Sequence, residues 1–159
     1  MTIMNSLVFI AMFAIVAYVV AMVIKNKEIP ESISSTVFNL DKKWKWVFSA
    51  VMWIVGFLLM PPLMEKVSDS TRFIAFFMVA GILFVGASPL VAKEKNTLHY
   101  VCAAVAGIAS QLLVALNQPL LLLIWFLYIG YTLAAKDGSR NFFWVEVSCM
   151  LSVFVYCLT

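Results

Sequence analysis

Charged residues are scarce in this chain. Lysine, arginine, aspartate and glutamate make up 12% of its 159 residues, and hydrophobic residues make up 64%. The charged share of a typical soluble domain is about a quarter, so this chain has far more apolar surface than a water-soluble fold presents. The composition excludes a soluble globular domain and predicts a protein that lies in a lipid bilayer.

Histidine is scarcer still, because His99 is the single one in the chain. One histidine excludes a His-rich metal site, and no HExxH, GxSxG, P-loop or GxGxxG pattern occurs. Of the three cysteines, Cys102, Cys149 and Cys157, the last two are separated by about 12 Å of helical rise, too far for a disulfide. We expect no metal, no cofactor and no catalytic residue.

The chain contains several long apolar runs. A membrane helix needs roughly 20 apolar residues to cross a hydrocarbon core about 30 Å thick. Stretches such as LLLLIWFLYIGYTLAA do not alternate apolar and polar residues as membrane β-strands do. We predict an all-α, polytopic integral membrane protein whose whole chain, 1–159, forms one transmembrane helical domain. Its six predicted helices cover about 6–24, 46–64, 73–92, 98–116, 120–135 and 142–158.

The positive charges lie mostly on one side of these helices. Nine lysines and arginines follow the first, third and fifth helices, and two lie on the opposite side. By the positive-inside rule the nine-residue side is cytoplasmic, so we expect a bacterial inner membrane and extracytoplasmic termini. The N-terminal MTIMN carries no positive charge, so we expect the first run to be a helix and not a signal peptide. The lysines form no basic stripe with aromatics, and we expect no nucleic-acid partner.

The longest connection, 25–45, has a pattern of its own. Its apolar residues recur at helical spacing, and polar side chains such as Glu31, Ser32 and Ser35 fall elsewhere around the axis. This pattern predicts a short interfacial helix on the cytoplasmic surface, and the alternative is an irregular polar loop. The apolar positions are Ile29, Ile33, Val37 and Leu40.

Turn and small residues suggest how the helices pack. The sequence Asn117-Gln118-Pro119 is a very tight turn, so we expect the fourth and fifth helices to be antiparallel neighbours. Small residues share one face of the first and of the fourth helix, an arrangement that brings helices close together in lipid. We interpret these faces as packing surfaces or as contacts in a homo- or hetero-oligomer. They consist of Ala14, Ala17 and Ala21 in the first helix, and Ala103, Gly107 and Ser110 in the fourth.

Polar side chains from four predicted helices lie at a similar depth near the cytoplasmic ends. An ionisable group inside a membrane span is costly and is therefore a functional candidate. We predict that these side chains form a polar chamber open to the cytoplasm. The structural alternatives are a carboxylate at a helix N-terminus and an interfacial histidine. The four residues are Ser49, Ser88, His99 and Glu146.

More specific contacts follow from the same positions. We expect His99 to face the bundle, with Glu146 or Ser88 as its hydrogen-bond partner. Ser110 and Gln111 lie deep enough to bond across helices. Asp69 and Arg72, three residues apart at the outer edge, are expected to form a helix cap and an exposed ion pair.

The stretch GILFVGASPLVAKEKNTLHYVCAAVAG, residues 81–107, resembles a pattern in the FRAG/DRAM/Sfk group of six-span membrane proteins and its bacterial relatives. In that pattern a Gly-rich helix ends near a proline, and a histidine begins a helix of small residues after a polar turn. The stretch IPESISSTVF is similar to short membrane proteins of Bacteroides-like bacteria. The resemblance implies six spans.

Three hypotheses for function follow. The leading one is a six-span inner-membrane protein without enzymatic activity that binds or passes a small molecule or lipid through the cytoplasm-facing polar chamber. The second is a structural or assembly partner of another membrane protein. The third is a metal-free intramembrane hydrolase built on Ser88, His99 and Glu146, because such triads are recognised by geometry and not by order in the chain. The expected partners are the lipid bilayer and a lipid or small-molecule ligand.

Overall fold

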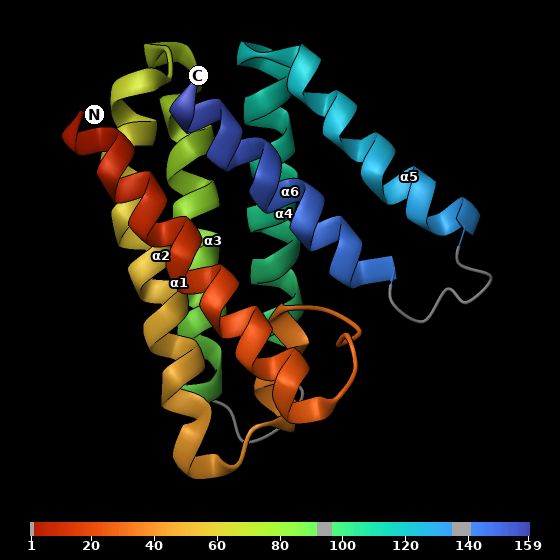
Figure 1. Ribbon diagram of the computed structural model, residues 1–159. Coiled ribbons are helices and arrows are strands. Elements are labelled where there is room, and N and C mark those ends of the chain that lie inside the picture. The colour runs from red at the N-terminus through yellow and green to blue at the C-terminus, as the bar shows by residue number, and fades with distance from the viewer. Residues whose placement is uncertain (1, 92–96, 135–140) are drawn as a thin grey trace.

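The protein is an all-α helical bundle, as the composition predicted (Figure 1). The computed structural model describes residues 2–91, 97–134 and 141–159, and these ranges contain no strand. Both chain termini lie at the same end of the bundle (Figure 1). The α-helices are α1 (Ile3–Asn26), α2 (Lys45–Lys66), α3 (Arg72–Val91), α4 (Thr97–Asn117), α5 (Trp125–Ala134) and α6 (Asn141–Leu158). The 3₁₀ helices are η1 (Ser34–Asn39), η2 (Lys42–Trp44), η3 (Asp69–Thr71) and η4 (Pro119–Ile124).

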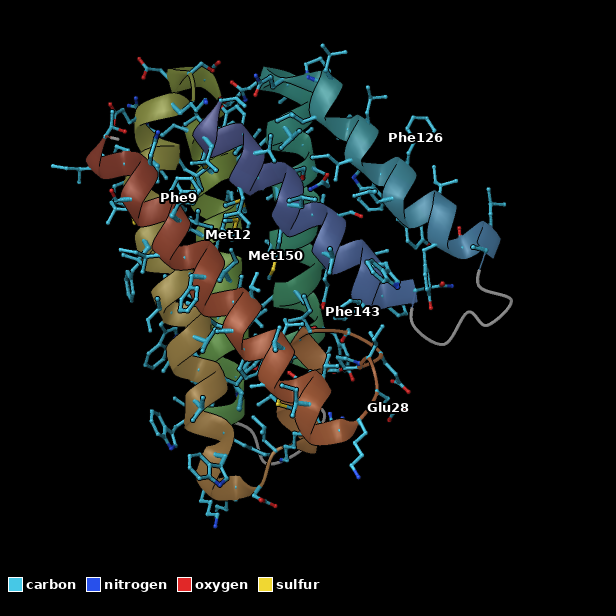
Figure 2. The ribbon with its side chains drawn as sticks, viewed as in Figure 1. Phe9, Met12, Glu28, Phe126, Phe143 and Met150 are labelled. Atoms are coloured by element: carbon cyan, nitrogen blue, oxygen red, sulfur yellow. The ribbon has the colours of Figure 1, made fainter. Side chains whose placement is uncertain are left out.

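Five helical stretches in the described part of the chain are long and apolar enough to cross a membrane. They correspond to five of the six predicted runs, and the remaining run forms a shorter apolar stretch, Pro119–Ala134. The outward faces of the bundle carry large apolar side chains, among them Phe13 at 74% exposure and Phe126 at 64%. Phe126 points away from the other helices (Figure 2). Surfaces of this kind fit a lipid environment better than water. The five stretches are Ile3–Asn26, Lys42–Lys66, Asp69–Val91, Thr97–Asn117 and Asn141–Leu158.

Helices that follow one another in the chain pack side by side from α1 to α4, and α6 packs against α4, α5 and α1. The tight turn at Gln118 holds η4 against α4, as expected. Beyond η4, however, α5 diverges from α4 and packs chiefly on α6 (Figure 1). The turn therefore makes only the beginning of this stretch a neighbour of α4, and a space can remain between α4 and α6.

The connection between α1 and α2 folds back beneath the bundle (Figure 1). It begins at Lys27, whose left-handed backbone (φ 58°) ends α1 and turns the chain. The predicted interfacial helix is present as the 3₁₀ helix η1. The apolar residues of the predicted pattern do face inward: Ile33 is 3% exposed and Val37 is fully buried. They are part of the core of the bundle, so this segment is a structural part of the bundle and not a helix resting on its surface.

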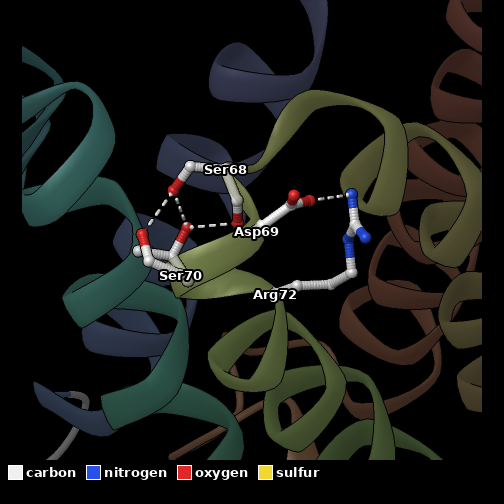
Figure 3. Close-up of polar contacts among 5 residues, drawn as sticks. Ser68, Asp69, Ser70 and Arg72 are labelled. Atoms are coloured by element: carbon white, nitrogen blue, oxygen red, sulfur yellow. Dashed lines mark hydrogen bonds and ion pairs between the residues drawn. The ribbon is translucent and has the colours of Figure 1, made fainter.

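The opposite end has a small polar turn between α2 and α3 (Figure 3). Arg72 and Asp69 form the expected exposed ion pair, with 2.7 Å between the guanidinium and carboxylate atoms. The hydroxyl of Ser68 bonds to those of Ser70 and Thr71, at 3.1 and 2.9 Å. An exposed ion pair of this kind contributes little stability. The turn connects the end of α2 to the start of α3.

Gly81 lies where α3 is in close contact with α4. A Cβ atom at this position would lie 2.9 Å from the Cβ and the backbone nitrogen of Ala106 and from the carbonyl oxygen of Cys102. Backbone atoms cannot move aside as a flexible side chain can. Because Gly81 has no side chain, α3 and α4 can pack in close contact here.

We expect Gly81→Ala to destabilise the bundle by about 1–3 kcal/mol, because the added methyl group overpacks the crossing. Gly130→Ala in α5 is the matched control, since a Cβ there has no neighbour within 4 Å. In an exposed helical position this exchange stabilises by up to about 1 kcal/mol. Thermal unfolding of both variants in the same mild detergent measures the difference, and equal transition midpoints would contradict the close crossing.

Candidate functional site

A cavity of about 980 Å³ lies between α4 and α6 and reaches α2 and α3. Ligand pockets in proteins commonly measure about 300–1,000 Å³, so this one is large. Its walls are mostly apolar, and the small face of α4 forms one of them. Met150 of α6, another lining residue, points into the interior of the bundle (Figure 2). The apolar wall residues include Met52, Val55, Met78, Ile82, Ala103, Ala106, Gly107, Cys149, Met150 and Val153.

The absence of a side chain at Gly107 contributes to this space. A Cβ atom there would meet only the sulfur of Cys149, at 4.0 Å, which is ordinary van der Waals contact. The small face of α4 was expected to bring helix backbones together. The three predicted residues, Ala103, Gly107 and Ser110, border the cavity instead. The close approach to α3 occurs at Ala106, opposite Gly81, and Ala106 was not part of the predicted face.

Residues 31–39, here called the floor segment, close one end of the cavity with polar groups. The carboxylate of Glu146 in α6 accepts hydrogen bonds from the backbone nitrogens of Ile33 and Ser34, the latter at 3.1 Å, and from the Ser34 hydroxyl. These nitrogens begin η1, where backbone N–H groups have no partner within the helix and attract an anion. In return, the backbone nitrogen of Phe143 donates to the carbonyl of Glu31 at 2.8 Å.

A second hydrogen bond ties the floor segment to α1. The hydroxyls of Tyr18 and Thr36 lie 2.7 Å apart in a buried position, and the Thr36 hydroxyl is also within 2.6 Å of the Ile33 carbonyl. Side chains of α1 and α6 thus hold the floor segment from two sides. Phe143 lies beside the segment at the start of α6 (Figure 2).

His99 lies apart from the cavity in a sealed polar pair. Its Nδ1 is 2.7 Å from the hydroxyl of Ser88, which confirms Ser88 as its partner. The Ser88 hydroxyl also donates to the Val85 carbonyl at 2.8 Å. In the tautomer with a proton on Nδ1 the Ser88 oxygen accepts from Nδ1–H, and in the other tautomer the Ser88 hydroxyl donates to Nδ1. Nε2 is buried and makes no hydrogen bond to a described residue.

Aromatic rings enclose this pair. The ring of Phe38, from the floor segment, lies 5.2 Å from the imidazole, and those of Tyr100 and Phe48 lie 5.7 and 6.2 Å away, measured between centroids. His99 is fully buried. As expected, it faces the bundle, but it is a packed core residue and not an anchor at the membrane surface.

The predicted chamber residues therefore separate into different environments. Glu146 lines the cavity, as do Glu31, Ser32 and Ser35 of the predicted interfacial segment. Ser88 and His99 form their own pair, and Ser49 is 2% exposed and donates to the Lys45 carbonyl of its own helix. Side chains at one depth can point to different sides of their helices, and depth was all that the apolar runs supplied.

The hydrolase hypothesis needs Glu146 beside His99, and the described residues show no hydrogen bond between them. The Glu146 carboxylate is bound by the floor segment, and neither Ser88 nor His99 lines the cavity. In the part of the chain that the structure describes, no group of three or more His, Cys, Asp or Glu side chains could hold a metal ion. The described residues therefore do not bring Ser88, His99 and Glu146 together as a triad.

Gln111 joins three helical segments at the deeper part of the cavity, as expected for a polar side chain in the middle of α4. Its amide nitrogen donates to the Ser110 and Ser152 hydroxyls, both at 3.0 Å. Its oxygen accepts from the indole nitrogen of Trp125 at 2.7 Å. Sequence reasoning did not identify Trp125, or the partners Ser34, Tyr18 and Thr36. For Trp125 a signal was present, because an indole N–H within an apolar run must find an acceptor.

No family model, curated protein or solved structure matches this chain. The resemblance to the FRAG/DRAM/Sfk group stays an expectation that rests on residues 81–107. Function must therefore be argued from the cavity and its polar floor.

We expect Glu146→Ala to release the floor segment, because it leaves three donors without their acceptor. Hydrogen bonds to a charged group contribute about 1.5–3 kcal/mol each, so the loss of even one of the three should accelerate amide exchange in residues 31–39 by at least about tenfold. Hydrogen exchange measured by mass spectrometry in detergent follows this segment. Glu65→Ala, which removes an exposed carboxylate of α2, is the control. Unchanged exchange in Glu146→Ala would show that this carboxylate does not hold the segment.

We expect Ser88→Ala to destabilise the protein by about 1–3 kcal/mol, because the buried Nδ1 of the imidazole loses its hydrogen-bond partner. In a His99→Phe background the same substitution should cost little, since no ring nitrogen remains to be satisfied. The four unfolding free energies form a double-mutant cycle that isolates the pair. Additive costs would mean that the 2.7 Å contact contributes nothing.

Proposed function

We propose that this protein is a six-span bacterial inner-membrane protein that binds or passes a lipid or another apolar small molecule in the cavity between α4 and α6. The cavity itself carries the proposal. Its walls are mostly apolar and its hydrogen-bonding groups are concentrated at the floor segment, which matches a molecule with an apolar body and a polar end. An empty space of this size in a bundle would forfeit packing, so its natural state in a membrane is filled.

The stretch Pro119–Ala134 is the proposed sixth span. Its six residues in η4 and ten in α5 give a length of about 27 Å, from rises of about 2.0 and 1.5 Å per residue. The hydrocarbon core is about 30 Å thick, so the stretch is close to the required length. An even number of spans agrees with the two termini lying at one end of the bundle (Figure 1).

The orientation follows from the lysines next to the floor segment. Lys25 and Lys27 precede it, and Lys42, Lys43 and Lys45 follow it. Positive residues favour the cytoplasmic side, so we place the polar end of the cavity at the cytoplasmic face of the membrane and both termini outside the cytoplasm. A ligand would then have its polar end toward the cytoplasm.

A second candidate function is that of an assembly partner for another membrane protein. Ala17 and Ala21 on α1 are exposed, and small side chains on an outward face permit close approach by a further helix. Native mass measurement in mild detergent separates the two functions. An obligate complex with a different membrane protein supports assembly, and an isolated monomer or homodimer that carries a bound lipid supports the cavity.

We expect Gly107→Leu to weaken binding of a long-chain fluorescent probe by roughly 15- to 60-fold, because the leucine occupies space that two or three ligand methylenes would use, at about 0.8 kcal/mol each. The Cβ position has room, so folding should be retained. Gly130→Leu is the matched control, since its side chain points into open space outside the cavity. Equal probe affinities in the two variants, both with wild-type thermal stability, would contradict the proposed site.

A further inference from the structure

We infer that the ligand of this cavity is a long-chain amphiphile with a cationic ammonium head group. This inference rests on the proposed function, because it describes the polar end of a ligand whose apolar chain fills the cavity. The observations that carry it are the charges and the rings at the floor segment.

The charged side chains that line the cavity are all acidic among the described residues. They are Glu31 and Glu146, and no lysine, arginine or histidine of the described chain joins them. Three donors of the floor segment already surround the carboxylate of Glu146. Glu31 differs, because it is exposed at the end of the cavity and its side chain makes no hydrogen bond or ion pair in the described chain. The nearby lysines lie outside the cavity lining, so a cationic head group inside it would meet the Glu31 carboxylate.

Aromatic rings flank the same end of the cavity. Tyr100, in the first turn of α4, lines the cavity, and its ring lies 6.4 Å from that of Phe38 in the floor segment. Phe142, in the first turn of α6, also lines it, and the next residue donates its backbone N–H to the carbonyl of Glu31. Both side chains are exposed in part, Tyr100 at 49% and Phe142 at 74%, so each is accessible to a ligand. The face of an aromatic ring attracts a cation within about 6 Å.

The hydroxyl groups of the floor segment complete the polar end. Ser32, Ser34 and Ser35 line the cavity next to Glu31. Hydroxyl oxygens accept hydrogen bonds from a primary ammonium, whereas a quaternary ammonium uses the rings and the carboxylate alone. An amine with free N–H groups can therefore use every polar feature at this end.

The test compares amphiphiles with the same sixteen-carbon chain and different head groups. The probes are hexadecylamine, hexadecyltrimethylammonium and hexadecyl sulfate, each displacing a long-chain fluorescent reporter from the full-length protein in nanodiscs made of an uncharged lipid. We expect both cations to bind at least about tenfold more tightly than the sulfate, as an opposite charge at a partly desolvated rim discriminates between ligands.

Two variants locate the preference. Glu31→Gln should reduce the ratio of cation to sulfate affinity by about threefold or more, because one charge at a partly exposed position is removed. Asp41→Asn is the control, since Asp41 is exposed in the same connection and does not line the cavity. It should leave the ratio unchanged.

The outcomes separate the two proposals. If no sixteen-carbon probe displaces the reporter, the proposed binding function is wrong. If all three bind equally, or the sulfate binds best, the cavity binds chains but the inference about the head group is wrong. If the cations are preferred and Glu31→Gln has no more effect than Asp41→Asn, the preference arises elsewhere and the assignment to this end of the cavity is overturned.

Discussion

The arrangement of this bundle depends on the contact between the Glu146 carboxylate and the start of the floor segment. It joins Glu146 to Ile33 and Ser34, which precede it in the chain by 113 and 112 positions. In an apolar surrounding a lone carboxylate is costly, and so are backbone N–H groups without acceptors. The hydrogen bonds between the carboxylate and the N–H groups remove both of these costs. The contact holds the connection between α1 and α2 beneath α6 and gives the cavity a polar end.

The same constraint accounts for the other polar side chains inside the bundle. Ser88 pairs with His99, Tyr18 pairs with Thr36, and Gln111 bonds to both α6 and Trp125. Buried polar groups are nearly always paired, and each of these pairs joins two different segments. They fix how the helices meet. The cavity is mostly apolar, with polar groups at the floor segment and at Ser110 and Gln111.

Small residues serve opposite purposes on the two sides of α4. On one side Gly81 lets α3 approach the backbone at Ala106, and on the other side Gly107 leaves space next to Cys149. The divergence of α5 toward α6 adds to this difference (Figure 1). A helix that is tightly packed on one face and open on the other is a firm wall for a binding cavity, because the packed face holds it in place.

The sequence alone determined the fold class and the apolar helices, because these depend on composition and on the length of each apolar run. It also predicted that His99 would pair with Glu146 or Ser88, and Ser88 is the partner. Only the tertiary structure decided which polar residues meet. The direction of a side chain depends on how each helix is rotated and on where a connection folds back, and both result from contacts distant in sequence. For that reason Glu146 lies with Ser34 of the floor segment, His99 lies with Ser88 away from the cavity, and Ser49 bonds only within its own helix.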